Sequence, residues 1–122
     1  MGTFTTGCRI ENHIDRERHF RLARLLVDTG SEHTWVPASK LEGIGVGREK
    51  KDVRFVMANG EVITRSVGFA ILRVGNAFTI DEVVFAEPGD LLLLGARTLE
   101  GLNLTVDSGR KRLVAAGPVP AA

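Results

Sequence analysis

The residues with the clearest chemical potential lie in the segment Leu25-Leu26-Val27-Asp28-Thr29-Gly30-Ser31. Three aliphatic side chains run directly into a carboxylate, so Asp28 is expected where the chain leaves the core. Loss of water there disfavours the charged form of a carboxylate, which therefore needs hydrogen-bond donors. Thr29 and Ser31 bring hydroxyls, and Gly30 allows close approach of the backbone. The segment predicts a functional aspartate, although an ordinary β-turn with Asp and Gly is the alternative.

The other reactive side chains do not form a recognisable site. His13, His19 and His33 lack the spacing of metal ligands, so no metal or other cofactor is expected. Cys8 is the one cysteine, which excludes an intrachain disulfide and fits a reducing compartment. The glycine-rich loop over 43–47 lacks the Gly-Lys-Ser/Thr of phosphate-binding loops, so it predicts no nucleotide site.

Length and composition favour one soluble globular domain over residues 1–122. The chain is 43% hydrophobic and 25% charged, and 16 Lys+Arg against 15 Asp+Glu give a net charge of +1. A balance so close to neutral argues against a nucleic-acid partner. No apolar run approaches the roughly 20 residues that span a bilayer, and no signal-peptide core follows Met1. We therefore expect no membrane partner and a cytoplasmic location.

The elements that must position Asp28 are predicted to be mostly β. Strands are expected over 3–12, 20–27, 53–57, 62–65, 67–74, 77–85, 91–94, 102–106 and 112–115, and brief helices over 37–43 and 96–100. Segment 20–27 is also compatible with a helix, because Leu, Ala and Arg favour helices. Asn59-Gly60 between apolar runs predicts a hairpin with a type I′ turn. Gly75-Asn76 and Asp107-Ser108-Gly109 predict two more hairpins, and so many short strands indicate a closed or sandwiched β fold.

A second motif, Leu93-Leu94-Gly95, follows the predicted hairpin around Asn59-Gly60. With it, the sequence resembles the retropepsin-like aspartic proteases (clan AA), including the single-domain bacterial proteins of that group. Leu26-Val27-Asp28-Thr29-Gly30-Ser31 matches the motif that carries the catalytic aspartate, and Ala58-Asn59-Gly60-Glu61 falls at the flap. The second motif is followed by the segment with Arg97, Leu99 and Glu100, where the resemblance implies a short helix. The resemblance implies an all-β fold, a retropepsin-like closed β-barrel with a flap hairpin and one or two short helices.

The resemblance also implies an aspartic endopeptidase that hydrolyses a peptide or protein substrate. It assigns Asp28, Thr29, Gly30 and Ser31 to the catalytic site. The Gly30 N–H and the Ser31 hydroxyl are expected to donate hydrogen bonds to Asp28, and Thr29 to bond across a subunit interface. The residues expected at the flap and the substrate cleft are Met57, Ala58, Asn59, Gly60, Leu93, Leu94 and Gly95.

A single Asp motif implies a homodimer. This hydrolysis needs two carboxylates about 3 Å apart that share one proton. One chain brings one motif, so two copies of Asp28 must meet across a two-fold axis. By resemblance, the pairing between subunits is expected from Met1–Thr6 and Leu113–Val119. Asp107-Ser108-Gly109 also fits the motif, but only 13 residues follow it, too few for a second lobe, so we interpret it as a hairpin turn.

The sequence departs from the family pattern at three places. Ala96 stands where relatives often carry an arginine directly after the second motif, and Arg97 comes next. The flap tip Asn59-Gly60 has fewer glycines than that of the retroviral enzymes, and the chain has no tyrosine, so the flap tyrosine of pepsin-type enzymes is absent. A non-catalytic dimeric module that binds peptides or serves as a scaffold is the second hypothesis. The intact Asp28 motif favours the enzyme over that module.

Overall fold

The computed structural model describes residues 3–121 and is mostly β. In that part of the chain the elements are β1 (Thr5–Glu11), β2 (His19–Val27), β3 (Thr34–Pro37), α1 (Ala38–Gly43), β4 (Lys50–Val56), β5 (Val62–Val74), β6 (Ala77–Ala86), β7 (Leu93–Leu94), α2 (Ala96–Gly101), β8 (Leu104–Asp107) and β9 (Arg112–Ala115). Both helices are only six residues long. The predicted all-β class with one or two short helices is confirmed.

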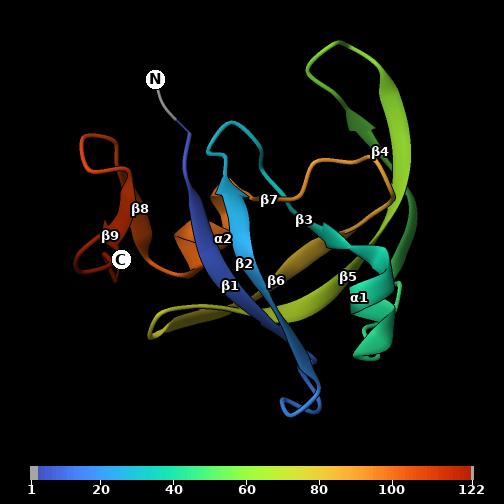
Figure 1. Ribbon diagram of the computed structural model, residues 1–122, viewed down its shortest axis with the longest axis horizontal. Coiled ribbons are helices and arrows are strands. Elements are labelled where there is room, and N and C mark those ends of the chain that lie inside the picture. The colour runs from blue at the N-terminus through green and yellow to red at the C-terminus, as the bar shows by residue number, and fades with distance from the viewer. Residues whose placement is uncertain (1–2, 122) are drawn as a thin grey trace.

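Seven strands form one sheet that closes on itself. Their order is β1-β2-β7-β3-β6-β5-β4, and β1 also pairs with β5, so six of them make a ring and β4 lies outside it at an edge. The hairpin of β8 and β9 is a separate sheet on the side of the molecule away from β4 (Figure 1). Among the described residues, no helix is long and apolar enough to cross a membrane.

The inside of the ring is the hydrophobic core. Side chains from β1, β2, α1 and β6 that are completely buried there include Ile10, Leu25, Leu41 and Phe85. Burial explains why segment 20–27 forms a strand and not the alternative helix. Its inward side chains alternate at Phe20 and Leu22 and, after an irregularity in the register with β1, again at Leu25 and Val27. The strand pairs antiparallel with β1 from His19 to Leu26.

Several predicted boundaries are wrong for the same reason, which is pairing with a distant strand. The two strands expected over 62–65 and 67–74 are one continuous strand, β5, because β4 pairs with its first half and β6 with its second. The strand expected over 53–57 begins earlier, at Lys50, and ends at Val56 as β4. In contrast, the expected strand over 91–94 is reduced to Leu93–Leu94, and Leu91 is exposed.

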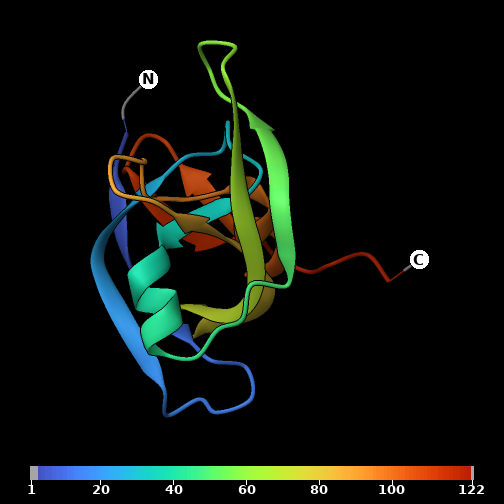
Figure 2. The same ribbon diagram turned by 90° about the vertical axis from the view of Figure 1, so that its right-hand side faces the viewer.

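The β4–β5 hairpin projects beyond the ring (Figure 1, Figure 2). Its tip is not the predicted type I′ turn, which needs positive φ at both Asn59 and Gly60. Only Gly60 is left-handed, with φ 86°, and its N–H donates to the Met57 carbonyl at 2.8 Å. The Met57 N–H donates to the Glu61 carbonyl, also at 2.8 Å. These bonds define a three-residue loop, in which a single glycine supplies the left-handed residue.

The β8–β9 hairpin packs against the hydrophobic core through Leu104, Val106 and Leu113. After β9 the chain leaves the body of the molecule as an extended tail (Figure 2). Of the two segments expected at a subunit interface, Met1–Thr6 is described only from Thr3 onward, since Met1 and Gly2 lie outside the described residues. Its last two residues, Thr5 and Thr6, begin β1.

Candidate active site

The two sequence motifs meet at the end of β2. There β7 runs parallel to β2, with Leu26 opposite Leu93 and Val27 opposite Leu94. The Asp28 N–H extends this pairing by donating to the Leu94 carbonyl at 3.0 Å. Two segments that are far apart in the sequence thus lie side by side where the loop that begins at Asp28 leaves β2.

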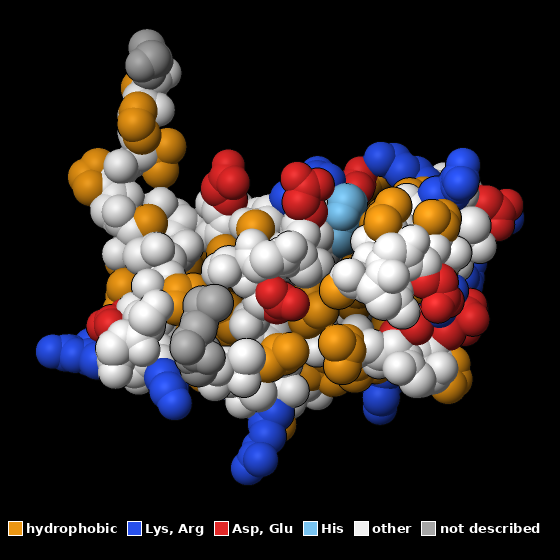
Figure 3. Space-filling view, turned by 90° about the horizontal axis from the view of Figure 1, so that it is seen from above, with side chains coloured by type: hydrophobic (Ala, Val, Ile, Leu, Met, Phe, Trp, Pro, Cys, Tyr) orange, Lys and Arg blue, Asp and Glu red, His pale blue; other side chains and the backbone are white. Residues whose placement is uncertain are grey.

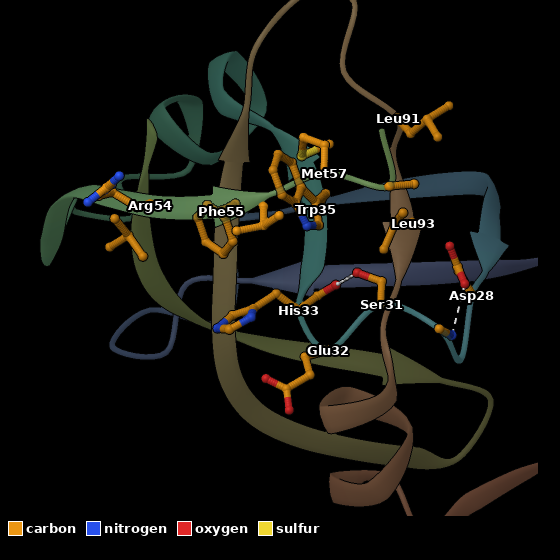
Figure 4. A pocket seen from close by; sticks show the side chains of 14 residues that line it. Asp28, Ser31, Glu32, His33, Trp35, Arg54, Phe55, Met57, Leu91 and Leu93 are labelled. Atoms are coloured by element: carbon orange, nitrogen blue, oxygen red, sulfur yellow. Dashed lines mark hydrogen bonds between the residues drawn. The ribbon is translucent and has the colours of Figure 1, made fainter. Parts of the chain in front are cut away.

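The Asp28 side chain is half-buried at the mouth of this loop (Figure 4). As predicted, the Gly30 N–H donates to Asp28 Oδ1, at 2.9 Å. The predicted hydrogen bond from Ser31 to Asp28 is wrong. The Ser31 hydroxyl donates to the His33 carbonyl at 3.2 Å, because the turn directs it toward the start of β3. Thr29 is exposed, and no intrachain partner of its hydroxyl is found among residues 3–121.

A cleft of about 600 Å³ separates Asp28 from the β4–β5 hairpin. Figure 4 shows Asp28 at one end of this cleft and Arg54 at the other. The residues that line it are Asp28, Gly30, Ser31, Glu32, His33, Trp35, Val53, Arg54, Phe55, Val56, Met57, Ala58, Leu91 and Leu93. Seen from above, the face that carries the hairpin exposes several hydrophobic side chains beside a histidine (Figure 3).

Only part of the predicted cleft residues line this space. Met57, Ala58 and Leu93 do. Leu94 is completely buried beneath the cleft, in the core. The lining does not include Thr29, Asn59, Gly60 or Gly95. Asn59 and Gly60 form the tip of the hairpin, beyond the lined space.

Aromatic packing forms the apolar wall of the cleft, which the sequence did not predict as a unit. Trp35 on β3 and Phe55 on β4 meet edge to face, with ring centroids 5.1 Å apart. The His33 ring also meets Phe55 edge to face, with ring centroids 5.4 Å apart. The alternation of β4 was the available signal, because it places Val53 and Phe55 on one face, and Met57 follows the strand at the next position of that alternation.

Charged side chains surround Glu82 at the edge of the cleft. The Glu82 carboxylate accepts from Lys50, from His33 at 3.1 Å and from Arg97 at 3.4 Å. The Lys50 hydrogen bond is the largest of the effects that hold the pKa of Glu82 below its ordinary value, although burial opposes it. Arg97, which follows Ala96, also lies 3.9 Å from the Asp81 carboxylate. Its ion pairs are therefore with two carboxylates of β6, those of Asp81 and Glu82.

A chain of buried hydroxyls fixes the second motif under the Asp28 loop. The Gly95 N–H donates to the Thr34 hydroxyl at 2.9 Å, and the Thr98 hydroxyl donates to Asp81 at 2.9 Å. The Thr34 and Thr98 oxygens are 2.6 Å apart, so the Thr34 hydroxyl must be the donor between them. Gly95 is required here, because a Cβ at this position would lie 2.3 Å from the His33 carbonyl oxygen.

Carboxylates near the cleft are few and not arranged for a metal. No group of three His, Cys, Asp or Glu residues within 3–121 could hold a metal ion. Glu32 is the other acidic residue in the lining, and its side chain points away from Asp28 (Figure 4). Among the described residues that line the cleft, Asp28 is therefore the one carboxylate at its end of the cleft.

Comparison with known proteins agrees with this arrangement. A family model described as aspartyl protease matches residues 18–98. The matched region begins just before β2, includes the β4–β5 hairpin and ends within α2. It therefore contains Asp28, the cleft and Gly95. No curated protein matches the chain.

Proposed function

The chain belongs to this aspartyl protease family, which is retropepsin-like, and we propose that it works as a homodimeric aspartic endopeptidase with Asp28 as its catalytic residue. The observation that carries the proposal is the placement of Asp28. Its carboxylate accepts the Gly30 N–H at one end of a cleft that is walled by the β4–β5 hairpin.

The single carboxylate requires the second subunit. Two Asp28 side chains at a two-fold axis would share one proton, because like charges about 3 Å apart do not both ionise. The ionised carboxylate takes a proton from a water molecule, whose oxygen attacks the scissile carbonyl carbon. The protonated carboxyl donates a hydrogen bond to the carbonyl oxygen. The C–N bond then breaks as the leaving nitrogen receives a proton.

The cleft fits an extended, largely apolar peptide. Trp35, Phe55 and Met57 offer it an apolar wall, and the hairpin over 50–74 serves as the flap. Thr29 is exposed beside Asp28, where its hydroxyl is free to bond with a second copy. The segments 3–6 and 113–119 contribute to the subunit interface in this proposal.

Replacement of Asp28 by Asn tests the mechanism. Asp28→Asn keeps the hydrogen bond from Gly30 but cannot act as a base, so cleavage of an unfolded casein should be lost while fold and dimer persist. Asp107→Asn is the matched control, since Asp107 also precedes a small residue and Gly but is the last residue of β8, at the β8–β9 turn. Cleavage is measured at acidic and neutral pH, with and without a pepstatin-like inhibitor. Activity of Asp28→Asn near that of wild type would remove Asp28 from the mechanism.

Dilution tests the shared site. Specific activity should fall through the dissociation constant of the dimer, followed by sedimentation in parallel with cleavage. A species that is monomeric and active at every concentration would overturn the dimeric mechanism. A dimer that binds unfolded peptide without cleaving it would favour the non-catalytic module instead.

A further inference from the structure

The β4–β5 hairpin is supported by the ring at only one end. The pairing of β5 with β6 stops at Val67, so residues 62–66 of β5 pair with β4 alone. β4 is itself an edge strand. The part of the hairpin that lines the cleft therefore leaves the strand pairing of the ring beyond Val67. Side-chain contacts hold it there, among them the packing of Phe55 against Trp35.

One ion pair lies at this point. Arg65 Nε donates to Asp90 Oδ2 at 2.7 Å, and the second arm of the guanidinium donates to Oδ1 at 2.8 Å. The two side chains are only 18% and 13% exposed. A two-point, charge-assisted contact with little solvent access is among the stronger polar interactions in proteins. The two hydrogen bonds therefore fix the orientation of the Arg65 guanidinium relative to the Asp90 carboxylate.

Asp90 belongs to a fixed turn between β6 and β7. Its Oδ2 accepts the Glu87 N–H at 2.8 Å, and its own N–H donates to the Glu87 carbonyl at 2.9 Å. Gly89 completes the turn with φ 95°. Arg65 therefore binds to a turn that has its own internal hydrogen bonds.

The two partners carry opposite walls of the cleft. Arg65 is directly opposite Val53 on β4, and Val53 begins the run of hairpin residues in the lining. Asp90 precedes Leu91 and Leu93, which line the cleft from the other side. Leu93 pairs with Leu26, two residues before Asp28. The ion pair therefore adds a directional polar contact between the hairpin and the segment that leads to the strand beside Asp28.

We propose that Arg65 and Asp90 are positioning residues that clamp the β4–β5 hairpin at the height needed to hold a peptide over Asp28. The clamp sets the fraction of molecules whose cleft is ready for substrate, and this consequence for turnover rests on the proposed endopeptidase function. The Arg65 hydrogen bond is the largest effect that lowers the pKa of Asp90. The pair consequently stays charged under the mildly acidic conditions that suit a shared-proton carboxylate pair.

Hydrogen–deuterium exchange of the free protein tests the clamp without reference to catalysis. Arg65→Gln should raise the exchange of residues 53–65 by about tenfold or more, since one charge-assisted contact of this kind has about that effect on an opening equilibrium. Asp90→Asn should do the same while retaining an acceptor for the Glu87 N–H, which separates the ion pair from the turn. Arg65→Lys, with charge but no two-point geometry, should be intermediate.

Arg73→Gln is the matched control, because Arg73 is on the same strand and also pairs with a buried carboxylate, that of Glu11, at 2.7 Å. It should lower global stability without a selective effect on residues 53–65. In the cleavage assay, Arg65→Gln should raise KM about tenfold and change kcat less than about threefold, because the bound peptide itself holds the hairpin down.

The outcomes separate the two proposals. Unchanged exchange of residues 53–65 in Arg65→Gln, or an equal rise in Arg73→Gln, would overturn the clamp. So would faster exchange in Arg65→Gln with an unchanged KM. Absence of any cleavage by the wild-type protein would refute the endopeptidase function, while the exchange experiment would still decide whether the ion pair holds the hairpin.

Discussion

At the scale of single residues, the candidate site depends on backbone donors and buried hydroxyls. The Asp28 carboxylate accepts a hydrogen bond from the Gly30 N–H, while the Ser31 hydroxyl donates to the His33 carbonyl. Deeper in the molecule, Thr34 and Thr98 are completely buried and bonded to each other. Their hydroxyls position the backbone at Gly95 and thereby the strand that supports Asp28.

Thr34→Val should lower the free energy of unfolding by about 1–3 kcal/mol, because the isosteric change leaves the buried Gly95 N–H without its acceptor and Thr98 without its donor. Urea denaturation measures the change. Thr105→Val on the exposed side of β8 is the control and should stay within about 0.5 kcal/mol of wild type. Equal stability of the two variants would contradict the structural role of the hydroxyl chain.

At the scale of elements, β5 has two tasks because it belongs to two hairpins. Its second half closes the ring with β1 and β6, and its first half carries the cleft wall with β4. The turns at the two ends of β5 both depend on a left-handed glycine, Gly60 with φ 86° and Gly75 with φ 58°. Only the first of these turns lies near the cleft.

Gly60→Val should reduce kcat/KM more than it reduces stability. The left-handed backbone costs a valine about 1–2 kcal/mol. Its Cβ would meet no atom within 4 Å, so the effect of the strain is confined to the tip of the hairpin. Gly75→Val has the same strain and the same open surroundings at the other turn. Cleavage and thermal unfolding of both variants should show similar losses of stability but a loss of turnover only for Gly60→Val. Equal turnover in the two would rule out a role of the tip in function.

At the scale of the whole molecule, carboxylates bonded to cationic side chains hold distant elements together. Glu11 on β1 is 2% exposed and accepts Arg9 at 2.8 Å and Arg73 of β5 at 2.7 Å, where the ring closes. Burial alone would raise the pKa of Glu11, but the hydrogen bonds and charges of Arg73 and Arg9 lower it overall. The pKa values of Glu82 and Asp90 are lowered mainly by Lys50 and Arg65.

Stability should therefore fall on acidification. A carboxyl whose pKa is lower in the folded than in the unfolded chain stabilises the fold above its ordinary pKa, which is 4.5 for Glu. That contribution is lost as the pH falls through the lowered folded value. We expect a nearly constant unfolding free energy from neutral pH to about pH 5 and a steep decline below it. Urea titrations at several pH values measure how steeply the unfolding free energy falls with pH. Glu11→Gln should make this dependence on pH shallower. A stability that rises toward low pH would contradict the assignment of these ion pairs.

Local sequence determined most of the elements and the candidate aspartate. The alternation of β2, the glycines near the three hairpin turns and the aliphatic run before Asp28 are features of neighbouring residues, and backbone preference acts at that range. For the same reason β9 was predicted with its observed bounds, Arg112–Ala115. The motif of Asp28 was recognisable because the Gly30 N–H, which donates to the carboxylate, lies two residues along the chain.

Only the tertiary structure decided which distant groups meet. Nothing near Arg65 in the sequence indicates Asp90, and nothing near Thr34 indicates Thr98, yet each pair is in direct contact. The continuous β5 and the cleft wall of Trp35 and Phe55 likewise depend on strands brought together by closure of the ring. Closure is driven by burial of apolar surface, which depends on the total area removed from water and not on the order of residues along the chain. Which polar side chains become partners therefore depends on the geometry that this burial imposes, and neighbouring residues in the sequence do not reveal it.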